Sequence, residues 1–367
     1  MTTIMVCLQN SILVLNSSDG FKIQEPLKGT NLQSTAFDPL KTYPQCISFD
    51  PLNPYRAYCG TLGNGMWKTD DGGQTWSNIG TDVISSPYIM SVAVSSLDSG
   101  NKFNKVYAGT EPSALYISND GGDSWERMET LNALPSSKSW SFPPRPWTHH
   151  IRWIEPDSNN PDYVFVAIEA GALVQSHDGG KTWIDRNEQG PYDTHTLATH
   201  SRAPKRLYSS AGDGYFESFD YGESWISPMK GLRHSYLNGL AIDSGNPEVV
   251  IISAARGPGE AYSAENGESY VYRKDEDSKK WKDVLNGLPE PHGSTTMLFV
   301  SNLQVPGEFY GVNNRGLFIS TDSGNSWKKI VTPWPREYLL QTPFRGPLQL
   351  TRRNHLSDDV VYVLLTF

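Results

Sequence analysis

One short pattern recurs along the chain and limits what the chain can fold into. The pattern is Ser/Thr-x-Asp-x-Gly-x-Thr/Ser-Trp, and it is intact in five places. Its aspartate and tryptophan are, in turn, Asp71 and Trp76, Asp120 and Trp125, Asp178 and Trp183, Asp220 and Trp225, and Asp322 and Trp327. Successive tryptophans are 49, 58, 42 and 102 residues apart, so a copy is missing from the last interval. The degenerate stretch YRKDEDSKKW, ending at Trp281, fills it, and NSSDGF at Asp19 is a second degenerate copy.

Seven units of about fifty residues would then fill residues 1–367, a period typical of solenoids and propellers. The units contain short alternating runs, such as YVFVAIEA at 163–170, that favour strands. The sequence therefore predicts an all-β fold. We expect one domain over residues 1–367, a single seven-bladed β-propeller with four-stranded antiparallel blades. Because the first unit lacks a first strand, we expect N- and C-terminal strands to share a blade and close the ring.

The repeated pattern has a structural explanation. Glycine supplies the positive φ of a tight turn, the aspartate and hydroxyl groups bond turn backbone, and tryptophan anchors the turn by its apolar surface. A catalytic motif would not be needed in five to seven copies. We therefore interpret these aspartates and tryptophans as structural.

Composition excludes several classes of function. The chain has 31 Lys and Arg against 40 Asp and Glu, a net charge of −9, which predicts neither nucleic acid nor a membrane as a partner. The N-terminus shows no basic region followed by an unbroken apolar run, and no stretch is long enough for a membrane helix. Three Cys without a CxxC pair give no disulfide framework and no zinc motif. We expect a cytoplasmic protein.

The repeated pattern resembles the Asp-box, also called the bacterial neuraminidase repeat. Proteins with this repeat include sialidases, xyloglucan-active hydrolases, sortilin-type receptors and photosystem II assembly factors. The blocks AIEAGAL, GPYDTHTLATH and AGDGYFESFDYGESW are most similar to an uncharacterised, sialidase-like prokaryotic branch labelled "glycosyl hydrolase". That label rests on fold, which does not determine function. A sialidase would need an arginine triad and an early Arg-Ile-Pro-like motif; no such motif is present, and sialidase activity is not expected.

The resemblance implies that the boxes join the third and fourth strands of each blade on one face. A funnel on the opposite face would be built by loops leading into first strands and loops joining second and third strands. Three long insertions, at 131–147, 256–270 and 333–347, are expected on that face. The aromatic residues of the first insertion, Trp140, Phe142 and Trp147, would either stack on a ligand ring or cover the core.

This scheme selects the candidate site residues. Repeat alignment places His150 and His195 at equivalent positions in consecutive units, and Glu111 and Glu169 each seven residues before a box hydroxyl. The candidate catalytic residues are Glu111, Glu169 and Asp213. The candidate ligand-binding residues are His149, His150, His195, His234, His292, Arg152, Arg256, Arg315, Tyr192 and Trp147. His150 and His195 are also candidate metal ligands, since neutral imidazoles with a carboxylate suit a divalent ion.

Three interpretations of this cluster remain open. The leading one is a binding or scaffold propeller that presents a His- and carboxylate-rich funnel to a small polar ligand or a protein partner. The alternative is a hydrolase or lyase on a carbohydrate-like substrate, with Glu111 and Glu169 as acid and base and one divalent metal as the candidate cofactor. In the third, these side chains only satisfy backbone groups and water in a central channel. The positions of the side chains distinguish these interpretations, because catalysis requires the carboxylates and imidazoles to converge on one shared space.

Overall fold

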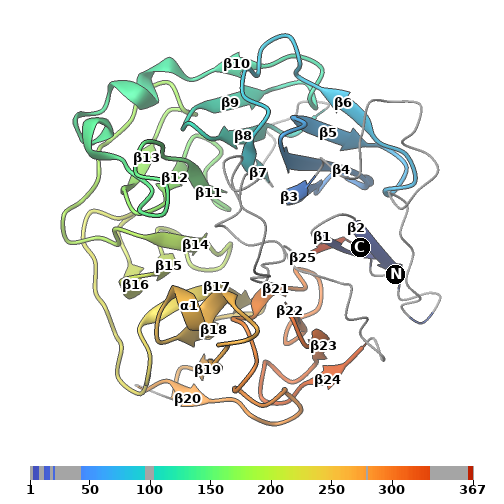
Figure 1. Ribbon diagram of the computed structural model, residues 1–367, viewed down its shortest axis with the longest axis vertical. Helices are drawn as coiled ribbons and strands as arrows, with labels where there is room; N and C mark the ends of the chain where they lie inside the picture. Colours follow the sequence, from blue (N-terminus) through green and yellow to red (C-terminus); the bar gives the residue numbers. More distant parts are fainter. Residues whose placement is uncertain are drawn as a thin grey trace.

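In the part of the chain that the structure describes, six blades, each made of consecutive strands, surround a central axis (Figure 1). The computed structural model describes residues 3–7, 12–16, 20, 43–95, 103–277, 280–330 and 363–366. In chain order the blades are β3 (Tyr43–Asp50), β4 (Asn53–Leu62), β5 (Met66–Thr69) and β6 (Ser77–Ile79); β7 (Ile89–Val94), β8 (Val106–Thr110), β9 (Leu115–Ser118) and β10 (Glu126–Arg127); β11 (Ile151–Pro156), β12 (Val164–Ile168) and β13 (Ala172–Ser176); β14 (Thr194–Ala198), β15 (Leu207–Ala211) and β16 (Gly214–Ser218); β17 (Tyr236–Asp243), β18 (Asn246–Ala255), β19 (Ser269–Lys274) and β20 (Lys282–Asp283); and β21 (Leu298–Ser301), β22 (Phe309–Asn313), β23 (Gly316–Ser320) and β24 (Lys328–Lys329). We number them blades 1 to 6.

The all-β class is confirmed, but the prediction of seven four-stranded blades is wrong. Within the described residues four of the six blades have four strands, while blades 3 and 4 have three. In these two blades the fourth position holds only single bridges, Gln175 with Ile184 and Glu217 with Ile226, because the chain leaves the sheet after one residue pair. The degenerate repeat ending at Trp281 does lie between the third and fourth strands of blade 5.

The two chain ends pair with each other in a smaller sheet. Its strands are β1 (Thr3–Cys7), β2 (Ile12–Asn16) and β25 (Val363–Thr366), in the order β2-β1-β25. The antiparallel pairing of β1 with β25 agrees with the expectation that terminal strands share a sheet. This three-stranded sheet lies between blades 1 and 6 in Figure 1. The predicted turn at Asp19 and the 333–347 insertion lie outside the described residues.

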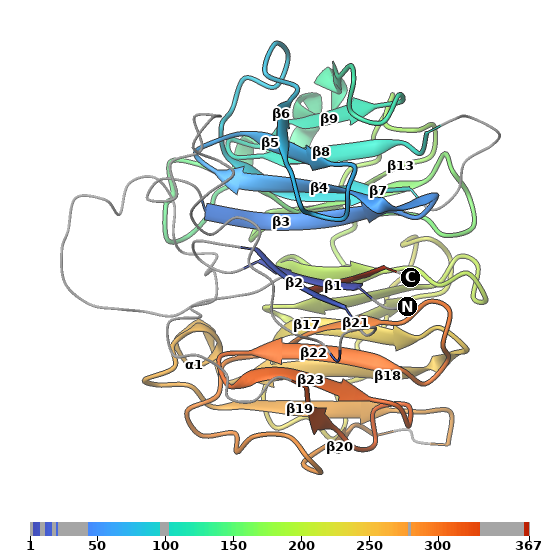
Figure 2. The same ribbon diagram turned by 90° about the vertical axis from the view of Figure 1, so that its right-hand side faces the viewer.

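Antiparallel pairing divides the loops between two faces. Loops that lead into first strands and loops between second and third strands lie on one face, which we call the site face. Turns between third and fourth strands lie on the other, the turn face. In the side view of Figure 2 the strands run across the molecule between these faces, and α1 (Pro258–Tyr262) lies beyond their ends.

Apolar packing lies mainly between neighbouring blades. The cluster between blades 2 and 3 contains fifteen buried residues, whereas the cluster between blades 3 and 4 contains three: Phe165, Leu197 and Leu207. A cavity of about 400 Å³, lined by residues of both blades including Gln175 and Trp225, lies at this junction. The junction of blades 3 and 4 is therefore less filled than its neighbour.

Short helices occur in two insertions. The 131–147 insertion forms η2 (Glu129–Ala133) and η3 (Pro135–Ser139), and α1 lies in the 256–270 insertion. Trp140 and Phe142 are buried, so these two aromatics cover the core, whereas Trp147 is 68% exposed. Over the parts of the chain that the structure describes, none of the helices has the length and apolar character needed to cross a membrane.

The repeated eight-residue segments form nearly identical turns, which we call the repeat turns. In the copy at 176–183, Asp178 Oδ1 accepts from Ser176 Oγ and from the Thr182 N–H, both at 2.8 Å, and Asp178 Oδ2 accepts from Thr182 Oγ1 at 2.6 Å. Ser176 Oγ in turn accepts from the Gly180 N–H at 2.8 Å, where φ is +94°. The same bonds recur around Asp71, Asp120, Asp220 and Asp322.

Replacing Ser176 by alanine is expected to destabilise the protein by about 1–3 kcal/mol, because the buried Gly180 N–H would lose its acceptor. Thr182→Ala is the matched control, since it removes only the exposed bond from Thr182 Oγ1 to Asp178 Oδ2, which should contribute about 1 kcal/mol or less. Denaturant unfolding of both variants measures the difference. Equal losses would contradict the assignment of the buried hydroxyl as the anchor of the turn.

Candidate functional site

A β-bulge or register irregularity lies near the start of the first strand in each of blades 1 to 5. The register shifts between Pro44 and Cys46, Ile89 and Ser91, Ile151 and Trp153, Thr194 and Thr196, and Leu237 and Leu240. The bulged residues are Gln45, Met90, Arg152, His195 and Asn238, all buried. Arg152 Nη2 lies 3.5 Å from Asn238 Oδ1, although their blades are not neighbours in the ring. Bulges re-aim side chains, and here those of Arg152 and Asn238 meet between blades 3 and 5.

The bulges correct one step of the repeat alignment. His195 is the bulged residue of β14, and its counterpart in β11 is Arg152 rather than His150. His150 precedes β11, so it is not structurally equivalent to His195. The two imidazoles nevertheless face the same carboxylate region from neighbouring blades.

Glu169 is at the centre of the buried cluster. It follows β12 and is only 3% exposed. His150 Nε2 donates to Glu169 Oε2 at 2.6 Å, and Arg152 Nε lies 3.7 Å from the same oxygen. Burial alone would raise the pKa of Glu169, but the positive charges of Arg152 and His150 outweigh it and lower that pKa to about 2. Glu169 is therefore an ionised acceptor at neutral pH.

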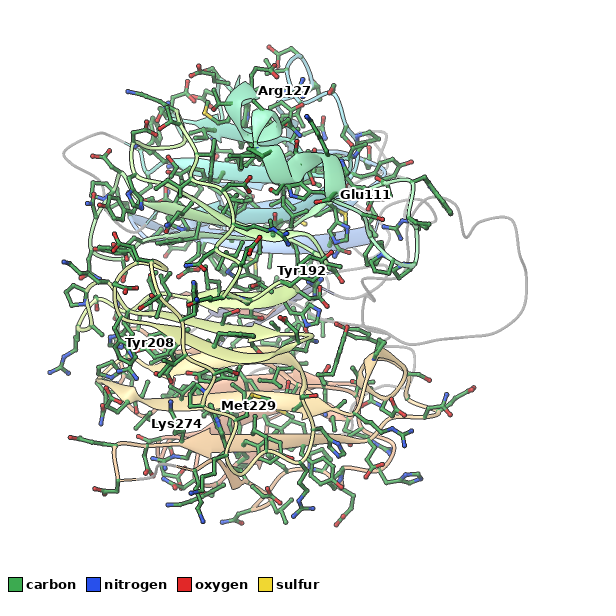
Figure 3. All side chains as sticks on the ribbon, turned by 90° about the vertical axis from the view of Figure 1, so that its left-hand side faces the viewer. Glu111, Arg127, Tyr192, Tyr208, Met229 and Lys274 are labelled. Carbon is green, nitrogen blue, oxygen red and sulfur yellow. The ribbon has the colours of Figure 1, made fainter. Side chains whose placement is uncertain are left out.

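Glu111 occupies the equivalent loop of blade 2 and is held by the 131–147 insertion. Arg145 donates to both carboxylate oxygens of Glu111, from Nε to Oε1 at 3.1 Å and from Nη2 to Oε2 at 2.6 Å. His150 Nδ1 is 3.6 Å from Glu111 Oε2, so this imidazole lies between the two glutamates. The guanidinium of Arg145 also stacks on Phe142, 4.7 Å from the ring centroid. Figure 3 shows Glu111 toward the right-hand edge of the molecule, with Tyr208 and Lys274 toward the left-hand edge.

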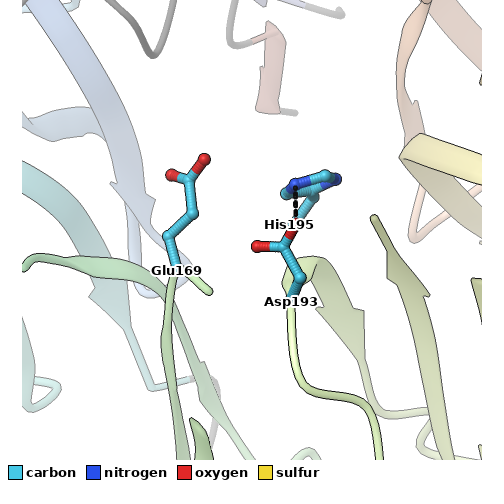
Figure 4. A group of neighbouring side chains, drawn as sticks. All are labelled: Glu169, Asp193 and His195. Atoms are coloured by element: carbon cyan, nitrogen blue, oxygen red, sulfur yellow. Dashed lines mark ion pairs between the residues drawn. The ribbon is translucent and has the colours of Figure 1, made fainter. Parts of the chain in front are cut away.

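His195 and Asp193 complete the site from blade 4. His195 Nδ1 donates to the carbonyl of Leu237 at 2.5 Å, which turns Nε2 toward Asp193 Oδ2 at 3.4 Å and Tyr236 Oη at 3.5 Å. Burial lowers the pKa of His195, but the carboxylates of Asp193 and Glu169 outweigh burial and raise it above the ordinary value. Figure 4 shows Glu169 and Asp193 converging with His195.

Other predicted site residues lie around this cluster rather than in it. His149 stands beside it with its ring against Trp140, and burial next to His150 lowers its pKa. Asp213 is exposed and accepts from the backbone N–H groups of Tyr192 and Asp193, so it positions the loop that carries Asp193. Residues on the outer rim are His234 against Tyr270, His292, Arg256 paired with Glu260, Arg315, and the exposed Tyr192 and Trp147.

Three residues at the site were not selected from the sequence. Arg145 comes from the Pro-rich insertion, and nothing in the local pattern pairs it with Glu111. Asp193 precedes His195 by two residues, and this Asp-x-His spacing at the start of a strand is the signal that could have found it. Tyr236 starts β17 and donates to Tyr262 Oη at 3.2 Å, and Tyr262 belongs to the 256–270 insertion.

The comparisons with known proteins identify the fold. No protein-family model and no curated protein matches the chain. The GH74 enzyme of Niastella koreensis matches with a TM-score of 0.66 at 16% identity, covering 89% of this chain and 51% of the enzyme. The structure titled YCF48 bound to D1 peptide matches with a TM-score of 0.52 at 20% identity, covering 79% and 82% of the two chains. The fold is that of a β-propeller.

A second enzyme, an ancestral GH74 protein, gives a TM-score of 0.60 at 18% identity and covers 80% of this chain and 39% of that one. This chain therefore spans about half or less of the length of the two GH74 enzymes. At these identities the likeness concerns the fold alone.

Proposed function

We propose that this chain is a binding propeller whose site face holds a small, carbohydrate-like polar ligand at the cluster around Glu169. The observation that carries the proposal is the convergence of His150, Glu169, Arg152 and His195, each 3% exposed or less, from two neighbouring blades. Burial of charged groups costs free energy, and a buried ion pair often stabilises a fold no more than apolar side chains of similar volume would. A buried ionic cluster is therefore better explained by binding than by stability.

The chemistry of the cluster suits a ligand rich in hydroxyl groups. The carboxyl oxygens of Glu169 and Asp193 accept hydrogen bonds, while the phenol of Tyr236 both donates and accepts. The exposed Trp147 of the insertion that contributes Arg145, and the exposed Tyr192 beside Asp193, offer ring faces on which a sugar can stack. The fold likeness to GH74 enzymes supports trying carbohydrates first.

The hydrolase or lyase function has less support from the geometry. An acid catalyst must carry a proton, and the pKa of Glu169 is lowered to about 2. Glu111 is held in a two-bond ion pair with Arg145, which leaves its carboxylate little freedom to act on a substrate. The likeness to a peptide-bound propeller keeps a protein partner as the competing occupant.

The test is a binding screen on tag-free protein. Thermal-shift measurements with a panel of mono- and oligosaccharides come first, followed by calorimetric titration of the best binder. Glu169→Gln and Tyr236→Phe should each weaken affinity by about tenfold or more, since each removes a hydrogen-bonding partner for the ligand.

Glu217→Gln is the matched control. Glu217 is also a buried, ion-paired glutamate, but it contacts Arg206, Lys274 and Tyr215 in blades 4 and 5. Its variant should lose stability and keep wild-type affinity. Unchanged affinity in Glu169→Gln, or binding of peptides but of no carbohydrate, would contradict the proposed function.

A further inference from the structure

We infer that Glu169, Asp193 and His195 form a binding site for a divalent first-row metal ion. One ligand atom from each residue lies within 4.8 Å of the others. Atoms bound to one ion at about 2.1 Å are at most about 4.2 Å apart, so shifts of under an ångström would bring all three to a common ion. Figure 4 shows the three side chains approaching the same space from neighbouring blades.

Each of the three side chains is oriented by a partner outside the group. His195 Nδ1 donates to the Leu237 carbonyl, so in the neutral imidazole Nε2 is the atom left with a lone pair. Asp193 Oδ1 accepts from the Ala170 N–H at 2.8 Å, and Asp193 Oδ2 faces His195. Glu169 Oε2 accepts from His150, which fixes that carboxylate. Metal ligands are commonly held in this way by outer hydrogen bonds.

The net charge of the surrounding side chains is compatible with a divalent cation. The acids of the cluster are Glu111, Glu169 and Asp193, and the arginines are Arg145 and Arg152. The three carboxylates and two guanidinium groups together carry one net negative charge before the histidines are counted.

One imidazole and two carboxylates suit Zn²⁺ or Mn²⁺ and do not fill either coordination sphere. The open positions would accept hydroxyl or carbonyl oxygens of a bound molecule. The inference deepens the proposed function by adding an ion to the same site, and rests on that function only for the role of the open positions. The ion itself needs no organic ligand to bind.

The experiment is calorimetric titration of metal-free, tag-free full-length protein with ZnCl₂ and, separately, MnCl₂, with no carbohydrate present. We expect one ion per chain. Asp193→Asn and His195→Gln should each weaken binding by about 100-fold or more, because each removes a direct ligand. His200→Gln is the matched control, since His200 is a buried histidine just after the same strand that bonds the Asp243 carbonyl instead. Circular dichroism establishes that each variant is folded.

A second measurement, by visible absorption, keeps the inference testable if one of the variants does not fold. Co²⁺ added to wild-type protein should give visible absorption bands that are absent in Asp193→Asn and retained in His200→Gln. No titratable binding of either ion, or equal affinity in wild type and His195→Gln, would overturn the inference. Carbohydrate binding is measured separately, in the presence of a chelator that removes any metal ion. A failed metal titration therefore does not contradict the proposed function, and failed carbohydrate binding does not contradict the metal site.

Discussion

Replacing Arg145 by methionine is expected to destabilise the protein by about 3–5 kcal/mol. Arg145 and Glu111 are each 5% exposed, and removal of one partner of a buried pair leaves an uncompensated charge. Equilibrium unfolding in urea at neutral pH measures the loss. The double variant Glu111→Gln/Arg145→Met should recover part of it, because the unpaired carboxylate is then neutral.

Arg127→Met is the control for Arg145→Met. Arg127 pairs with Glu129 at 3.4 Å, but the two side chains are 43% and 70% exposed. Such surface pairs contribute about 0–1 kcal/mol. If Arg145→Met cost no more than Arg127→Met, the ion pair with Glu111 would not anchor the insertion at 131–147.

Replacing Glu155 by glutamine is expected to remove a pH dependence of stability. The carboxylate accepts from Thr199 N–H and Oγ1 at 2.9 and 3.1 Å and from Trp153 Nε1 at 3.3 Å. Burial raises the pKa of Glu155 from 4.5 to about 7 despite these bonds. Between those two pH values the folded protein holds a proton that the unfolded chain has released.

The sign of the effect follows from proton linkage. Because the folded state binds more protons in this interval, the free energy of unfolding falls as pH rises through it, by up to about 3 kcal/mol. Most of this stabilisation is present below pH 4.5 and is lost above pH 7. Since other groups also titrate, the measured quantity is the difference between wild type and Glu155→Gln in urea unfolding at several pH values. Parallel curves would contradict the raised pKa.

The repeat turns made much of the fold predictable. Their side chains bond backbone only a few residues away, so the local sequence contains the interaction, as at Ser176 and Asp178. The number of strands in each blade was not fixed in this way. Blades 3 and 4 keep intact turns but end after one bridge at Ile184 and Ile226, where the outer strand depends on packing rather than on the turn.

The site was predictable only in part. Glu111 and Glu169 were found because they occupy fixed positions before a repeat turn. The equivalence of His150 with His195 was wrong, because β11 and β14 carry the bulge at the same position and Arg152, not His150, occupies it in β11. Arg145 was missed because its contact with Glu111 joins two residues 34 positions apart through an insertion that has no repeat.

The proposed function places the bound ligand at Glu169 on the site face. A crystal structure of the protein in complex with the tightest-binding carbohydrate tests this most directly. Ligand oxygens should lie within hydrogen-bonding distance of Glu169, Asp193 or Tyr236. A ligand seated instead in the outer cavity between blades 3 and 4, against Gln175 and Trp225, would contradict it.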